Sequence, residues 1–110
     1  MRLLLLAALA LCATACAGPH FSHIEIDGRP FGLATLSVAD GQVAVVQVIS
    51  RDSDDRTMST VLRSRNTAVA DVGTTQVGGF ALYGNAPGET TIEAYADGEL
   101  VATAPIIVTK

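Results

Sequence analysis

The segment TTIEAYADGELVATAPIIVT, residues 90–109, decides the fold of this chain. On both sides of Asp97-Gly98, apolar and polar side chains alternate, as they do along a β-strand with one face in a core. An Asp-Gly pair between two such runs is a strong signal for a two-residue hairpin turn. The segment therefore predicts a β-hairpin, and its alternation assigns these side chains to the inward face: Ile92, Ala94, Ala96, Ala104, Ile106 and Val108.

Turn signals recur along the rest of the chain, among them Asp27-Gly28, Asp40-Gly41 and Pro87-Gly88. Between them lie short runs rich in Val, Thr and Ile, without the period of about 3.6 residues that marks an amphipathic helix. Turn signals about every 8 to 12 residues are typical of an all-β sandwich or barrel. We expect strands near residues 22–26, 33–38, 42–50, 57–64, 68–72, 77–84, 90–96 and 100–109.

Two of these runs also carry face information. Residues 43–49 are apolar on both faces, which leaves the register open and favours Ala44, Val46 and Val48 as the core set. In the run 57–64, one set of side chains alternates with another: Met58, Thr60 and Leu62 with Ser59, Val61 and Arg63.

The N-terminus is typical of a signal peptide. Residues 3–13 form an uninterrupted apolar run after Met1-Arg2. As a helix this run spans about 16 Å, whereas a bilayer core is about 30 Å thick. We therefore predict a signal helix over residues 1–15 that is cleaved, because nothing later in the chain is patterned to pack against it.

Ala13-Thr14-Ala15-Cys16 resembles the lipobox of bacterial lipoproteins. In that family the cysteine thiol receives a diacylglycerol and the leader is cut just before it. The resemblance implies that Cys16 is the lipidated first residue and the membrane anchor. The family most often has Leu three positions before the cysteine, where this chain has Ala13. The alternative is an ordinary secretory leader cut after Ala15, which would leave Cys16 as a free thiol.

The single cysteine of the mature chain excludes an intrachain disulfide, because Cys12 leaves with the leader. The domain must therefore depend on its hydrophobic core.

We assign residues 16–22 to the lipidated cysteine and a short tether, and residues 23–110 to one domain. Ala17, and not Asp, follows the anchor, which by resemblance to enteric lipoproteins favours the outer membrane over the inner membrane.

Three motifs resemble bacterial Ig-like domains of group 2, found in invasin- and intimin-like adhesins. They are DGQ at 40–42, SRNTAVADV at 64–72 and APGETTIEA at 86–94, in the family's order and spacing. The resemblance covers about 33–109 and implies an Ig-like β-sandwich of about 7–8 antiparallel strands. Leu62 stands where the family usually has Trp. The family shares no catalytic residues, so none is carried over.

Charge and titratable residues exclude several function classes. The formal net charge of −4 argues against nucleic acid as a partner, because such binding needs clustered Lys and Arg. An acidic cluster, Asp52, Asp54 and Asp55, offers carboxylates of the kind that bind calcium. It lacks the Gly and terminal Glu of an EF-hand loop and is flanked by arginines, so we favour a solvated loop and no metal site.

Catalysis and cofactors are not indicated either. His20 and His23 make a poor metal site without a third ligand, and no later histidine is present to activate a Ser or Thr. Phe80, Tyr83 and Tyr95 are candidates for a small aromatic patch that binds a sugar or a protein. The competing expectation is that at least one of them lies in the core. We expect a protein that is not an enzyme and uses no cofactor.

The expected function is that of an exported lipoprotein, held in the cell envelope by its lipid, that displays one Ig-like module. Its role would be structural, adhesive or in protein interaction, with an envelope protein or a polysaccharide as partner. The alternative is a periplasmic lipoprotein that binds calcium or a small ligand through the acidic loop or the aromatic patch.

Overall fold

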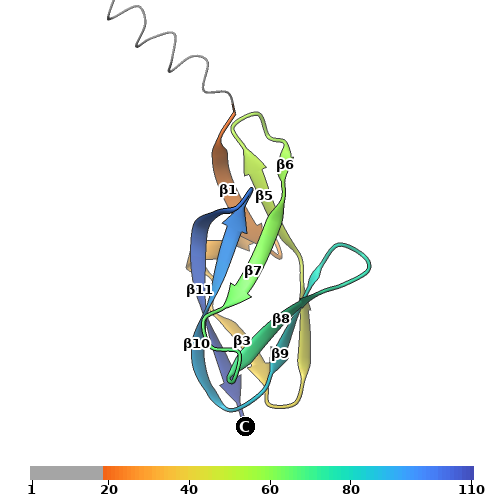
Figure 1. Cartoon of the computed structure of the whole chain (residues 1–110), viewed down its shortest axis with the longest axis vertical. Helices are drawn as coiled ribbons and strands as arrows, with labels where there is room; N and C mark the ends of the chain where they lie inside the picture. Colours follow the sequence, from red (N-terminus) through yellow and green to blue (C-terminus); the bar gives the residue numbers. More distant parts are fainter. Residues whose placement is uncertain (1–18) are drawn as a thin grey trace, which may run out of the picture.

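The computed structural model describes residues 19–110 of the chain. The predicted signal helix over 1–15 and the lipidated Cys16 lie outside the described residues. Within residues 19–110 the chain consists of strands and one short 3-10 helix, Phe31–Leu33 (Figure 1). The strands are β1 (Phe21–Ile26), β2 (Arg29–Pro30), β3 (Leu36–Ala39), β4 (Val43–Val46), β5 (Val48–Asp52), β6 (Thr57–Met58), β7 (Thr60–Ser64), β8 (Ala70–Thr74), β9 (Phe80–Gly84), β10 (Gly88–Ala96) and β11 (Glu99–Thr109).

The strands form two layers. One layer is the sheet β3-β11-β10-β7, and the other consists of the sheets β2-β1-β5-β6 and β4-β9-β8. The two sheets of the second layer are joined, because β4 and β5 are successive halves of one extended run with only Gln47 between them. Strands β1, β5/β4, β9 and β8 take the places of A, B, E and D in an Ig-like sandwich, and β7, β10 and β11 those of C, F and G. The predicted fold class is confirmed.

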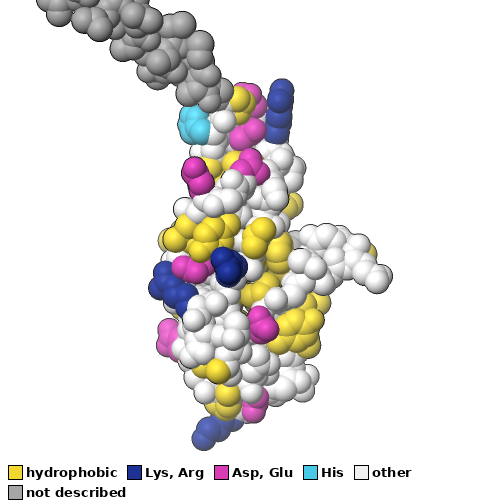
Figure 2. Space-filling view, viewed as in Figure 1, with side chains coloured by type: hydrophobic (Ala, Val, Ile, Leu, Met, Phe, Trp, Pro, Cys, Tyr) yellow, Lys and Arg dark blue, Asp and Glu magenta, His cyan; other side chains and the backbone are white. Residues whose placement is uncertain are grey.

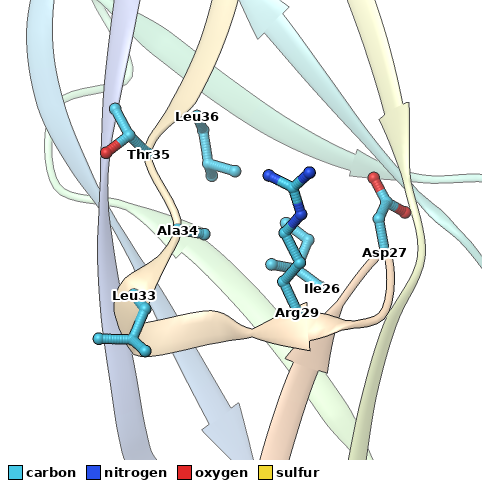
Figure 3. Close-up of a pocket in the computed structure, with 7 residues that line it drawn as sticks. All are labelled: Ile26, Asp27, Arg29, Leu33, Ala34, Thr35 and Leu36. Carbon is cyan, nitrogen blue, oxygen red and sulfur yellow. The ribbon is translucent and has the colours of Figure 1, made fainter.

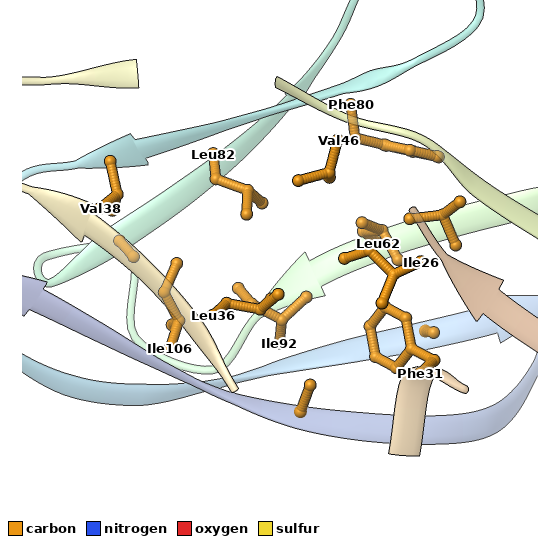
Figure 4. Packing of buried hydrophobic residues seen from close by; sticks show 14 of the residues in the cluster. Ile26, Phe31, Leu36, Val38, Val46, Leu62, Phe80, Leu82, Ile92 and Ile106 are labelled. Carbon is orange, nitrogen blue, oxygen red and sulfur yellow. The ribbon is translucent and has the colours of Figure 1, made fainter. Parts of the chain in front are cut away.

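The hairpin β10–β11 is the longest pairing, and its predicted inward face is confirmed. All of its predicted core side chains are at most 2% exposed. The favoured face of residues 43–49 is confirmed too, since Val46 and Val48 are buried while Val43 and Val45 are exposed. Together these strands enclose the apolar core that is shown in Figure 4.

The prediction of a strand over 33–38 is wrong in its first half. A 3-10 helix begins at Phe31, after Pro30 with φ −57°, and β3 begins only at Leu36. The chain has to pass here from one layer to the other, because β1 pairs with β5 and β3 pairs with β11. The Phe31 side chain is fully buried and points into the core cluster (Figure 4).

The pairing of β3 with β11 is parallel, which corrects the expectation of antiparallel strands throughout. Leu36 lies beside Ile106, and Val38 beside Val108. The crossing at Phe31–Leu33 brings the chain to the edge of β11 that faces away from β10.

Two runs that were predicted as single strands are each interrupted. The run 42–50 breaks at Gln47, where the turn residue Asp27 is docked. The Asp27 N–H donates to the Gln47 carbonyl oxygen at 2.8 Å, and the Gln47 N–H donates to Asp27 Oδ1 at 2.8 Å. Asp27 has a φ of +48°, as the first central residue of a two-residue hairpin turn requires.

The run 57–64 breaks in the same way at Ser59, where Asp97 is docked. The Asp97 N–H donates to the Ser59 carbonyl oxygen at 2.9 Å, and the Ser59 N–H donates to Asp97 Oδ1 at 3.0 Å. At this break the chain leaves β5 as a partner and joins β10. The alternation that was predicted for 57–64 survives the break, because Leu62 is buried whereas Val61 and Arg63 are exposed.

Three strand boundaries differ from the prediction for local reasons. β8 begins at Ala70 because the Asn66 carbonyl oxygen accepts the N–H groups of Val69 and Ala70 in a turn. β9 begins at Phe80 because residues 75–79 form the hairpin loop, with Gly78 at φ +84°. β1 begins at Phe21, inside the stretch that the sequence assigned to the tether.

Candidate interaction surfaces

The acidic cluster lies at the last residue of β5, Asp52, and in the loop between β5 and β6, at the end of the sandwich where β1 begins (Figure 1). Asp52 Oδ1 accepts the N–H groups of Asp54 and Arg56, each at 2.9 Å. Asp55 lies 3.8 Å from the Arg51 guanidinium. The carboxylates of Asp52 and Asp55 are therefore engaged with the loop itself. Among residues 19–110 no group of three or more His, Cys, Asp or Glu side chains is arranged to hold a metal ion.

The two histidines lie on the surface at the start of the domain. His20 exchanges backbone contacts with Ser53, whose N–H donates to the His20 carbonyl oxygen at 2.8 Å. His23 Nδ1 lies 3.3 Å from Ser22 Oγ. These contacts tie the first strand to the acidic loop and bring no further metal-ligating side chain to either histidine.

The three aromatic residues do not form a patch, which overturns that hypothesis. Phe80 is buried in the core at 7% exposure. Tyr83 lies on the outer face of β9, and Tyr95 lies on β10 in the opposite layer. The separation follows from alternation and from the layers, since Phe80 and Tyr83 point to opposite faces of one strand.

An apolar surface covers the outer face of β4 and β9. Val43 lies beside Tyr83, and Val45 follows on the same face. These side chains are 53%, 40% and 61% exposed for Val43, Tyr83 and Val45. The Tyr83 ring lies against Gly73 of β8, where a Cβ atom would be 3.0 Å from Tyr83 Cε2. Gly73 thus leaves room for the ring to lie flat on the sheet.

A half-open pocket of about 570 Å³ lies between the β1–β2 turn and residues 33–36. In Figure 3 the Arg29 guanidinium lies between the Asp27 carboxylate and the wall that Leu33 to Leu36 provide. Leu33 is 84% exposed at its rim. The lining offers one cation from Arg29, one carboxylate from Asp27, the hydroxyl of Thr35 and aliphatic side chains. Asp27 Oδ1 already accepts the Gln47 N–H at 2.8 Å.

The edge strands β7 and β8 face each other across an open seam between the layers. A groove of about 290 Å³ runs along it, lined by Leu62, Arg63, Ser64, Thr67, Asp71 and Val72.

On the face seen in Figure 2, apolar side chains gather around the middle of the sandwich, and charged side chains of both signs are scattered around them. Among residues 19–110 there is no helix that is long and apolar enough to cross a membrane.

Comparison with solved structures identifies a class of similar domains. Domains 4 and 5 of the S-layer protein SbsC match with a TM-score of 0.66 and 26% identity, covering 84% of this chain and 54% of that fragment. Domains 5–6 of the same protein match with a TM-score of 0.66 and 25% identity, over 84% and 45%. The Lin-41 filamin domain is less similar, at a TM-score of 0.49 and 20% identity over 82% and 97%.

This chain spans about half of those two SbsC fragments, and 13% of the longer SbsC structure that covers residues 31–844. None of the protein-family models matches the chain, and neither does any curated protein. The likeness confirms the Ig-like sandwich that the sequence predicted.

Proposed function

We propose that this chain is an exported lipoprotein, anchored through Cys16, that displays one Ig-like module of the bacterial group 2 type in the cell envelope. Its role is structural, adhesive or in protein interaction, and it is not catalytic. The observation that carries the proposal is the likeness of this sandwich to domains of an S-layer protein, at a TM-score of 0.66 over 84% of this chain.

The surfaces of the domain support an interaction role. The outer face of β4 and β9 exposes apolar side chains of a kind that a soluble monomer usually covers or keeps scattered. The pocket beside Arg29 is open, and its one carboxylate, Asp27, already accepts the Gln47 N–H. An envelope protein or a polysaccharide is the partner class that we propose for these faces.

The arrangement of the chain ends suits an anchored module. β1 begins at one end of the long axis, and β11 ends at the other (Figure 1). An anchor that precedes residue 19 therefore leaves the opposite end, with the β3–β4 and β9–β10 turns, farthest from the membrane. Stable anchoring needs at least two lipid chains or equivalent signals, which a lipoprotein-type modification of Cys16 supplies.

Metabolic labelling with palmitate tests the anchor. We expect the chain to take up label in a bacterium that processes lipoproteins, and the label to be lost in Cys16→Ser. The matched control is Cys12→Ser, which should keep the label because Cys12 lies in the leader. Label that persists in Cys16→Ser, or a wild-type chain that takes up none, would overturn the proposal.

A further inference from the structure

Strand β7 has one paired edge and one unpaired edge. It is the last strand of the sheet β3-β11-β10-β7 and pairs only with β10 on that side. The Arg65 N–H donates to the Thr91 carbonyl oxygen at 3.0 Å, and the Ser59 carbonyl oxygen accepts from Asp97. Backbone groups alternate in direction along a strand. The N–H and C=O groups of Thr60, Leu62 and Ser64 therefore point away from β10.

The neighbouring edge strand, β8, is partly closed by its own residues. Its outward N–H groups at Ala70 and Val72 donate to the Asn66 carbonyl oxygen at 3.1 Å and to Asp71 Oδ1 at 2.8 Å. Edge strands are commonly blunted by such devices, by proline or by bulges. β7 has no proline and no bulge, and it carries one charged side chain, Arg63, on its outer face. Within residues 19–110, no hydrogen bond engages its outward N–H groups.

We propose that β7 pairs antiparallel with β7 of a second copy of this chain, across a two-fold axis that passes through Leu62. In this register Leu62 lies opposite the second copy's Leu62, and Thr60 lies opposite the second copy's Ser64. Every outward backbone group of the strand is then used, in about six hydrogen bonds. The two sheets become one continuous sheet across the pair, and the interface is isologous.

Side chains on the outer face favour this register. Residues directly opposite each other in an antiparallel pair point to the same face. With Leu62 opposite Leu62, Val61 lies opposite the second copy's Arg63, and both side chains point to the outer face. Val61 is 49% exposed there. Sliding the strands by two residues one way sets Arg63 against Arg63, which like charge disfavours. Sliding them the other way leaves the Ser64 groups unpaired.

The pair has a defined orientation. Because the strands run antiparallel, the starts of the two β1 strands lie at opposite ends of the pair. If the proposed anchor precedes residue 19, the two copies reach each other from facing surfaces, which makes the contact adhesive. Only this last consequence depends on the proposed function, because the pairing itself needs no lipid.

Disulfide trapping of the full chain in the envelope of producing cells tests the pairing. Val61→Cys combined with Arg63→Cys places two cysteines opposite each other in a non-hydrogen-bonded pair, at a Cα separation of about 4.5 Å that a disulfide can span. We expect the double variant to give cross-linked dimers on mild oxidation and each single variant to give few. The palmitate experiment reports separately on the anchor.

Charge variants of the purified full chain supply a second measurement. Val61→Lys sets Lys opposite Arg63 at two symmetric places and should raise the dimer dissociation constant about tenfold, and Val61→Glu should lower it by a similar factor. Leu100→Lys is the matched control, since Leu100 is 50% exposed on the same sheet face two strands away. A chain that stays monomeric and untrapped, or that pairs with the same affinity in both Val61 variants, overturns the proposal. Equal affinity in both Val61 variants would indicate that the partner strand at the edge of β7 is a different extended segment.

Discussion

Asp97 and Ser59 are joined by two hydrogen bonds, at 2.9 Å and 3.0 Å, although they lie 38 positions apart in the chain. Asp27 and Gln47 repeat the arrangement at the other hairpin, with both bonds at 2.8 Å. In each case the first residue of an Asp-Gly turn occupies the break in a neighbouring strand. The two turns therefore reverse the chain and also hold together strands that are distant in sequence.

Removing the Asp97 carboxylate should weaken the domain at this junction. Asp97→Ala leaves the Ser59 N–H without its acceptor, and it places a β-carbon without a compensating bond at a φ of +47°. We expect a loss of about 1 kcal/mol in the free energy of unfolding, measured by urea titration. Asp97→Asn keeps an acceptor and tolerates the left-handed conformation, so it should remain close to the wild type. Equal stabilities of the two variants would contradict this role.

Gly84 is required by a close approach of β9 to the end of β3. A Cβ atom there would collide with the Ala39 carbonyl oxygen and come within 3.1 Å of Val108 Cγ1. We expect Gly84→Ala to cost about 1–3 kcal/mol, seen as a lower melting temperature. Gly32→Ala is the matched control, because nothing lies within 4 Å of its Cβ position. Equal melting temperatures for the two variants would contradict the close contact of Gly84 with Ala39.

Ser50 and Thr60 form a polar link between the two layers, since their hydroxyl groups are hydrogen-bonded and Ser50 is fully buried. Thr60→Val removes the partner and should cost about 1–3 kcal/mol, because the Ser50 hydroxyl is left unsatisfied. Adding Ser50→Ala should recover part of that loss. A double-mutant cycle by urea unfolding measures the coupling. Additive effects of the two substitutions would exclude the link.

Calcium should leave the stability of the domain unchanged. Asp52 Oδ1 already accepts two backbone N–H groups, and Asp55 faces the Arg51 guanidinium. We expect the same melting temperature with calcium and with a chelator, for the wild type and for Asp54→Ala. A rise with calcium that disappears in Asp54→Ala would support the ion-binding alternative.

Alternation along the sequence was enough to predict the faces of the strands. The inward set of the last hairpin, the core set Ala44, Val46 and Val48, and the buried Leu62 all follow from a period of two residues. The Asp-Gly pairs predicted turns at Asp27 and Asp97 correctly. These features are local, so the residues that determine them lie next to each other in the chain.

The missed features depend on residues far apart in the sequence. Nothing near Gln47 or Ser59 signals a break, because the cause is an aspartate on another hairpin. Phe31 resembles any apolar strand residue, yet it fills the core from a 3-10 helix where the chain crosses between layers. The open edge of β7 could not be predicted either, because it depends on which strands pair, and β7 is the last strand of its sheet.

The central claim, an exported module that is held in the envelope by lipid on Cys16, is tested most directly by the intact mass of the protein isolated from membranes of producing cells. We predict a mass equal to residues 16–110 plus a diacylglyceryl group and an amide-linked acyl chain. A mass that corresponds to a chain still starting at Met1, or to residues 16–110 without any lipid, would contradict the account.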